Sequence, residues 1–176
     1  MTQRRRPPDV FLDRDGVIIR NRSDYVKSWA EVEILPGAPE AIAALTRNGS
    51  RVIVITNQSA VARGLVSLDT VEEMHRRLQR VIEDAGGHVT AFYVCPHHPD
   101  DGCDCRKPRP GLLLRAAREH GIDLPRAYFV GDQAGDMEAA AAAGCTGVLV
   151  DPDLAATVRL ILERSGNQPA AGASSL

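Results

Sequence analysis

The segment Phe11-Leu12-Asp13-Arg14-Asp15-Gly16-Val17 sets the expected fold of this chain, because it joins an apolar run to two acids and a glycine. The run Val10–Leu12 is typical of a short buried strand. The glycine lets a ligand approach the backbone closely, and the two carboxylates stand two residues apart beside it. Asp and Gly are also common turn residues, so the segment alone fits an ordinary strand-to-helix turn equally well.

Four further apolar runs follow, each flanked by polar residues or glycine, and they are also typical of buried strands. They are Val52–Ile55, Ala91–Val94, Tyr128–Val130 and Val148–Val150. Segments with helical spacing alternate with them: Ala38–Arg47, Leu68–Asp84, Gly111–His120, Asp136–Ala143 and Asp153–Glu163. A parallel crossover needs a dozen or more residues and usually spends them on a helix. The order therefore predicts an α/β fold, with a parallel sheet covered by helices on both faces.

The composition limits the class of function. A length of 176 residues suits one domain, expected over residues 1–164, and the Ala/Gly/Ser/Pro-rich residues 165–176 are expected to be a disordered tail. The formal net charge of −2 and the 4% aromatic content offer no basic or stacking platform for nucleic acid. No run approaches the roughly 18 apolar residues of a membrane span, and no signal core follows the basic start. We expect a cytoplasmic monomer with neither nucleic-acid nor membrane partners.

The chemically distinctive side chains come directly after the apolar runs. They are Asp13, Thr56 with Asn57, Cys95, and Asp132. In an open parallel sheet, ligands bind beyond the carboxyl ends of the strands. Side chains far apart in the sequence are therefore expected to converge on one edge of the sheet.

Phosphoryl transfer is the chemistry that these residues suit. A metal ion between Asp13 and a phosphate would screen the repulsion between anions, so that an Asp13 oxygen can attack phosphorus. Asp15 would protonate the leaving oxygen and then deprotonate the attacking water.

Each remaining segment also has a simpler interpretation. Thr56-Asn57-Gln58-Ser59 offers a hydroxyl and amides to phosphoryl oxygens, but Thr56 or Asn57 would also serve as a helix N-cap. Lys107, in Arg106-Lys107-Pro108, offers a positive charge, but lysines in such loops are usually solvated. Asp132 offers a hard oxygen ligand to Mg²⁺, whereas Asp136 would also suit a helix N-terminus.

Taken in this order, the four segments resemble motifs one to four of the haloacid dehalogenase superfamily. The resemblance implies a Rossmann-like sheet and a Mg²⁺-dependent hydrolase in which Asp13 becomes transiently phosphorylated. It implies that Asp15 is the general acid/base, that Thr56 and Lys107 hold the phosphoryl group, and that Mg²⁺ is bound by Asp13, Asp132 and the Asp15 backbone carbonyl. Asp136 would then not bind the metal directly. Because Asp15 is present, the family pattern favours a phosphatase over a dehalogenase, and the spacing between motifs is too short for a cap domain.

The loop Cys95-Pro96-His97-His98-Pro99-Asp100-Asp101-Gly102-Cys103-Asp104-Cys105 is expected to bind a second metal. Three cysteines and one histidine complete a tetrahedral structural Zn²⁺ site, with no position left open for catalysis. A loop of free thiols is the alternative, and the residues alone do not choose between His97 and His98. A zinc site here would brace Arg106 and Lys107, which follow immediately.

This loop, together with Asp13–Gly16 and Thr56–Gly64, resembles the subfamily of D-glycero-D-manno-heptose 1,7-bisphosphate phosphatases and histidinol-phosphatases over nearly all of residues 9–150. The resemblance selects His97 as the zinc ligand beside Cys95, Cys103 and Cys105. It also implies substrate contacts by the loop around Tyr25 and by Arg106, in addition to Thr56, Asn57, Gln58, Ser59 and Lys107. The motifs Cys-Pro-His-His-Pro and Asn-Gln-Ser-x-x-Ala-Arg-Gly favour removal of the 7-phosphate from the heptose bisphosphate. Histidinol phosphate is the alternative substrate, and a non-catalytic zinc-stabilised binding module is a third possibility.

Overall fold

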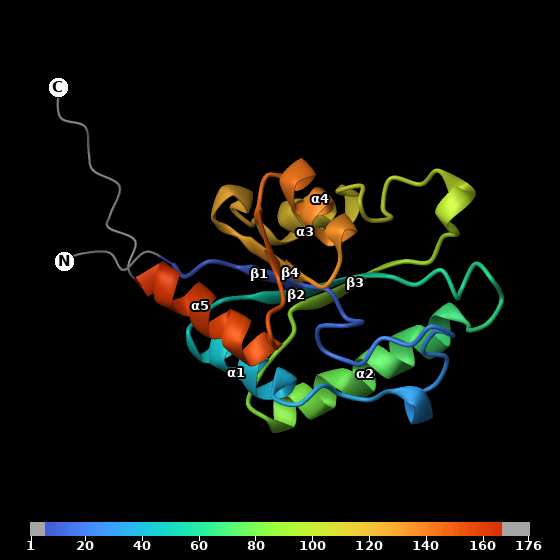
Figure 1. Cartoon of the computed structure of the whole chain (residues 1–176), viewed down its shortest axis with the longest axis horizontal. Coiled ribbons are helices and arrows are strands. Elements are labelled where there is room, and N and C mark those ends of the chain that lie inside the picture. Colours follow the sequence, from blue (N-terminus) through green and yellow to red (C-terminus); the bar gives the residue numbers. More distant parts are fainter. Residues whose placement is uncertain (1–5, 167–176) are drawn as a thin grey trace.

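A five-stranded, wholly parallel sheet forms the centre of the protein, as seen in a computed structural model that describes residues 6–166 (Figure 1). Its strands are β1 (Val10–Leu12), β2 (Val52–Asn57), β3 (Ala91–Cys95), β4 (Tyr128–Gly131) and β5 (Thr146–Leu149). They lie in the order β3-β2-β1-β4-β5, so β1, the first strand along the chain, is the central strand of the sheet. The predicted α/β class with a parallel sheet is confirmed.

Alternating side chains along the strands build two separate cores. Val10 and Leu12 of β1 belong to one buried cluster, whereas Phe11 between them belongs to the other. In β2, Val52 and Val54 share the first cluster, while Ile53 and Ile55 share the second. Successive strand residues point to opposite faces, so a strand that is apolar throughout requires cover on both faces.

Helices supply that cover. Figure 1 shows α1 (Ala38–Arg47), α2 (Leu68–Asp84) and α5 (Leu154–Gly166) on one face and α3 (Gly111–His120) and α4 (Ala134–Ala143) on the other. Short 3-10 turns lie at Trp29–Glu31, Pro99–Asp101 and Leu124–Arg126. The predicted bounds of α1, α2 and α3 are confirmed. The predicted tail began too early, because Ser165 and Gly166 belong to α5, and residues 167–176 lie outside the described residues.

Helix α2 illustrates why these segments are helical. The Ser67 side chain accepts a hydrogen bond from the Thr70 N–H and so caps the first turn. Its buried residues fall at positions i, i+3, i+4, i+7 and i+11, which share one face of a helix: Val71, Met74, His75, Leu78 and Ile82. That spacing places one stripe of the helix against the sheet.

Strand β2 extends two residues further than its apolar run. Thr56 and Asn57 are the last residues of β2 and pair with Val94 and Cys95 of β3, so neither is a helix N-cap. Within residues 6–166, the segment between β1 and α1 holds only one 3-10 turn, and no cap domain covers the carboxyl ends of the strands. No helix in that part of the chain is long and apolar enough to cross a membrane.

Candidate active site

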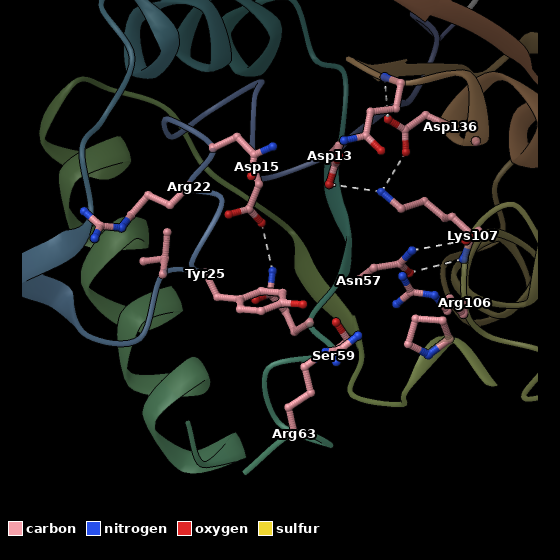
Figure 2. A pocket seen from close by; sticks show the side chains of 16 residues that line it. Asp13, Asp15, Arg22, Tyr25, Asn57, Ser59, Arg63, Arg106, Lys107 and Asp136 are labelled. Atoms are coloured by element: carbon pink, nitrogen blue, oxygen red, sulfur yellow. Dashed lines mark hydrogen bonds and ion pairs between the residues drawn. The ribbon is translucent and has the colours of Figure 1, made fainter. Parts of the chain in front are cut away.

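A cavity of about 260 Å³ opens at the carboxyl ends of the strands (Figure 2). Eight predicted site residues line it: Asp13, Asp15, Tyr25, Asn57, Gln58, Ser59, Arg106 and Lys107. Asp136, which was expected to lie close by without binding the metal, lines it as well. Two other predicted residues, Thr56 and Asp132, do not line the cavity. The sequence therefore placed most of the site residues on the correct edge of the sheet.

Three carboxylates gather at one end of the cavity. Oxygens of Asp13, Asp132 and Asp136 lie within 4.8 Å of one another. Two glycines make this approach possible, because a Cβ on Gly16 would lie 2.1 Å from an Asp132 oxygen and a Cβ on Gly131 would lie 2.3 Å from the Asp136 Cβ. Gly16 also has φ of +83°, a conformation that L side chains rarely adopt.

Lys107 is the cation of this cluster, and all three of its donors are used. Its Nζ lies 3.0 Å from Asp13 Oδ1, 2.8 Å from Asp136 Oδ1 and 3.1 Å from the carbonyl oxygen of Ile55. The interpretation of Lys107 as a solvated loop residue is wrong, because the side chain is buried. Asp136 meanwhile does suit a helix N-terminus, since its Oδ2 accepts the backbone N–H groups of Asp132 and Gln133 at 3.1 and 3.2 Å.

Burial and mutual repulsion set the protonation of these groups. Burial raises the pKa of Asp13 from 3.8 to about 7, outweighing the Lys107 ammonium, and the charges of Asp136 and Asp15 add to the rise. Burial, followed by Asp136, also raises the pKa of Asp132. For Lys107, burial alone lowers the pKa, but Asp13 and Asp136 outweigh it and raise the pKa. One lysine thus faces three acids, and the cluster favours an additional cation.

The donor set fits Mg²⁺. Hard oxygen ligands suit this ion, which takes only one or two protein carboxylates together with phosphate and water. Asp132 Oδ1 is buried without any hydrogen-bond partner, so it has a free lone pair to offer. Asp136 is less available, because Lys107 and two backbone N–H groups already engage its two oxygens.

Asp15 lies apart from the carboxylate cluster, and four hydrogen-bond donors contact its carboxylate. Arg14 makes two parallel contacts to its carboxylate, at 3.1 and 3.0 Å, and Gln58 Nε2 donates at 2.8 Å. Thr56 is fully buried behind this group, where its hydroxyl lies 3.4 Å from Asp15 and accepts from Gln58 Nε2 at 2.7 Å. Contact between Thr56 and a phosphoryl group stays a prediction.

Arginines line the outer part of the cavity. Arg22, Arg63 and Arg106 all border it, and Arg106 Nη1 is buried without a hydrogen-bond partner. The guanidinium of Arg63 lies 5.9 Å from the centre of the Tyr25 ring, and Tyr25 has φ of +66°, uncommon for a residue with a side chain. Figure 2 shows Arg63 across the cavity from Asp13, whereas Arg22 lies nearer to Asp15 and Arg106 lies beside Lys107. In the sequence, Arg63 stands out only as a member of the Asn-Gln-Ser-x-x-Ala-Arg-Gly motif, because spacing alone does not show which way a loop arginine points.

Asn57 contacts the protein backbone on the opposite wall. Its Oδ1 accepts the Lys107 N–H at 3.1 Å and its Nδ2 donates to the Lys107 carbonyl at 3.2 Å (Figure 2). The amide thus ties the end of β2 to the Arg106-Lys107 turn. This clamp positions Lys107, and the predicted contact between Asn57 and substrate stays a prediction.

The cysteine loop forms a compact cluster of metal-ligand type. Cys95 Sγ lies 3.7 Å from Cys103 Sγ and 3.2 Å from Cys105 Sγ, and His97 Nδ1 lies 3.6 and 3.1 Å from the sulfurs of Cys95 and Cys105. Tetrahedral zinc with Zn–S bonds of about 2.3 Å holds its sulfurs about 3.8 Å apart, so the cluster fits this ion. The neighbouring His98 instead caps a 3-10 turn by accepting the Asp100 N–H at 3.2 Å. The structure therefore separates two histidines that residue chemistry alone did not.

This fold and site define a hydrolase, and the family model agrees. Residues 9–144 match the model of the haloacid dehalogenase-like hydrolases, and the chain belongs to this family. It is 49% identical over 141 residues to the D-glycero-beta-D-manno-heptose-1,7-bisphosphate 7-phosphatase of Pseudomonas aeruginosa, covering 80% of this chain and 79% of the relative. The corresponding alpha-heptose enzyme of Mycobacterium bovis is 43% identical over 148 residues, covering 80% of this chain and 78% of the relative.

A solved structure is similar over nearly the same range. The D,D-heptose 1,7-bisphosphate phosphatase of Bordetella bronchiseptica, crystallised with magnesium and phosphate, superposes with a TM-score of 0.86 at 39% identity. The match covers 89% of this chain and 99% of that chain. The predicted family resemblance is confirmed.

Proposed function

We propose that this chain is a phosphatase that removes the 7-phosphate of D-glycero-D-manno-heptose 1,7-bisphosphate. The observation that carries the proposal is a cavity with two unlike ends, a buried carboxylate-lysine cluster inside and arginines outside. The similarity to relatives named for this activity supports the same substrate. Relatives of both anomeric names match, so we do not assign the anomer.

Hydrolysis would proceed in two displacements. Asp13 Oδ attacks phosphorus to form an aspartyl phosphate, while Asp15 donates a proton to the departing sugar oxygen. Asp15, now a carboxylate, then accepts a proton from the water that attacks phosphorus and releases phosphate. Lys107 neutralises Asp13 and the phosphoryl oxygens throughout. Mg²⁺ held by Asp13, Asp132 and the Asp15 carbonyl would supply the charge needed to bring two anions together.

The outer arginines favour a bisphosphate over histidinol phosphate. A second phosphate would meet Arg106 and Arg63, and charge-assisted contacts between guanidinium and phosphate are among the stronger hydrogen bonds. Histidinol phosphate would bring a cationic amine to the same wall, where like charges repel. The unpartnered, buried Arg106 Nη1 is the donor best placed for the distal phosphate.

Replacing Arg106 by Gln is therefore expected to lower kcat/KM for the bisphosphate by about 10- to 100-fold, the value of one or two charged hydrogen bonds. The effect on heptose 7-phosphate, which lacks the distal phosphate, is expected to be small. Arg118→Gln, an exposed change on α3, serves as the control. The measurement is the rate of phosphate release from the heptose bisphosphate, from heptose 7-phosphate and from histidinol phosphate. Preference of the wild-type enzyme for histidinol phosphate would overturn the substrate assignment.

A structural zinc ion is the second part of the proposal. We expect about one zinc per chain, and we expect Cys105→Ser to lose it together with activity, because the loop leads directly into Arg106 and Lys107. Cys145→Ser is the matched control, since Cys145 is a buried cysteine that does not belong to the Cys95-His97-Cys103-Cys105 group. Elemental analysis of the purified variants makes the comparison. A wild-type protein without zinc, or a Cys105→Ser protein that retains it, would contradict the proposal.

A further inference from the structure

Arg14, between the two acids, is almost completely enclosed. Its side chain is 1% exposed, although arginine stays protonated under all ordinary conditions. A buried guanidinium is costly unless an anion and further acceptors compensate it. The groups that compensate the buried charge of Arg14 therefore indicate the role of this residue.

One end of the guanidinium grips Asp15. Nε donates to Oδ2 at 3.1 Å and Nη2 donates to Oδ1 at 3.0 Å, a two-pronged pairing that fixes the plane of the carboxylate. Asp15 is 20% exposed and lines the cavity, so this pairing links a fully buried guanidinium to a carboxylate that faces the cavity.

The other end of the guanidinium meets a histidine that is remote in sequence. Arg14 Nη1 lies 3.2 Å from Nε2 of His75, which is buried on the inner face of α2. Because guanidinium can only donate, Nε2 must accept, and His75 is therefore neutral with its proton on Nδ1. Burial, followed by the Arg14 charge, lowers the pKa of His75 to about 3, which is consistent with that state. The imidazole stacks on Phe92 of β3, with ring centres 4.5 Å apart and planes 14° from parallel.

We propose that Arg14 and His75 are positioning residues, a buried strut that runs from α2 to Asp15 and holds its carboxylate toward the leaving oxygen. The proposal rests on the proposed function, in which Asp15 is the general acid/base. Arg14 presents the carboxylate to the cavity, and His75 prevents the guanidinium from rotating away. A role in stability alone would affect every substrate equally, whereas a positioning role depends on the leaving group.

Leaving groups of different basicity separate the two roles. An alkyl phosphate such as heptose 7-phosphate expels a basic alkoxide that needs a proton, whereas p-nitrophenyl phosphate expels a phenolate that does not. The ratio kcat/KM is the suitable quantity, because it includes only steps up to release of the first product. Hydrolysis of the aspartyl phosphate, common to both substrates, does not enter it.

His75→Phe is the main variant, because it keeps a ring to stack on Phe92 and removes the acceptor. We expect kcat/KM for heptose 7-phosphate to fall by about tenfold or more, since small displacements of a catalytic group carry large penalties. We expect less than about a threefold change with p-nitrophenyl phosphate, which also shows that the variant is folded. His75→Gln, whose amide oxygen can accept from Arg14, is expected to recover most of the loss. His88→Phe, an exposed histidine beyond the end of α2, is the matched control.

Asp15→Asn in the same assay separates a failure of the Arg14-His75 strut from a failure of the proposed role of Asp15. If Asp15→Asn discriminates between the leaving groups and His75→Phe does not, the strut is wrong and the proposed function stands. If Asp15→Asn lowers kcat/KM equally for both substrates, the assignment of Asp15 as general acid/base fails. Equal losses in His75→Phe for both substrates, or no recovery in His75→Gln, would likewise overturn the strut.

Discussion

Asn in place of Asp13 is expected to abolish phosphate release, by about four orders of magnitude or more, while making the folded protein more stable at neutral pH without added Mg²⁺. Activity is lost because an amide cannot form the phosphoryl-enzyme. Stability rises because Asp13 is one of three clustered carboxylates that share a single lysine. A loss of function combined with a gain in stability is characteristic of a residue kept for its chemistry.

The pH dependence gives this prediction a sign that can be checked. Burial raises the pKa of Asp13 in the folded chain to about 7, whereas 3.8 is its ordinary value. The folded state therefore binds more protons between these values, so the contribution of Asp13 to stability falls as pH rises through that window. Because asparagine does not titrate, Asp13→Asn removes this pH-dependent loss of stability.

Thermal melts at pH 4, 5.5 and 7.5 measure the effect. The Tm advantage of Asp13→Asn over the wild type should be small at pH 4 and should grow toward pH 7.5. Asp123→Asn, an exposed change at the start of a 3-10 turn, should show no such growth. Substantial turnover by Asp13→Asn, or a Tm advantage that shrinks with rising pH, would contradict the assignment.

Lys107→Met is expected to destabilise the folded protein, the opposite of Asp13→Asn, although the Lys107 Nζ lies only 3.0 Å from Asp13 Oδ1. Removing the ammonium leaves three enclosed carboxylates without their cation, and breaking a buried pair in this way costs about 3–5 kcal/mol. Activity should also be lost, because Lys107 is the cation in contact with Asp13, the proposed nucleophile. Urea unfolding without added Mg²⁺ measures the change in free energy of unfolding.

A double variant tests whether charge is the cause. Asp13→Asn added to Lys107→Met removes one of the unpaired acids, so it should recover part of the lost stability. Lys107→Met that is as stable as the wild type would show that Lys107 does not neutralise the cluster. A double variant less stable than Lys107→Met alone would show that lost packing, not charge, is the cause.

The fold was predictable because its strands are apolar on both faces and its helices carry regular buried stripes. The predicted bounds of helices and strands were wrong where polar residues belong to those elements. Thr56 and Asn57 resembled a cap because of their residue types, yet they extend β2 by pairing with β3. Likewise α4 begins at Ala134, two residues before the predicted Asp136, because Gln133 and Asp136 form a capping box that includes the acid in the first turn.

The site was predictable to the extent that its residues follow strands. Asp13, Lys107 and the cysteine loop were found because motif order places them at one sheet edge. The contact between Arg14 and His75 spans 61 residues, and no local pattern marks it. The clamp of Asn57 on the Lys107 backbone was equally invisible, because backbone acceptors carry no signature in a sequence. Tertiary contacts of this kind appear only when the elements are assembled.

Trapping the phosphoryl-enzyme tests the central claim most directly. The enzyme is mixed with substrate and Mg²⁺, quenched in acid during turnover and reduced with borohydride, which converts an aspartyl phosphate to homoserine. Peptide mass spectrometry then locates the modified residue. The proposed chemistry predicts homoserine at position 13 and nowhere else, and none in Asp13→Asn. Homoserine at another aspartate would contradict it, as would turnover without any trapped intermediate at position 13.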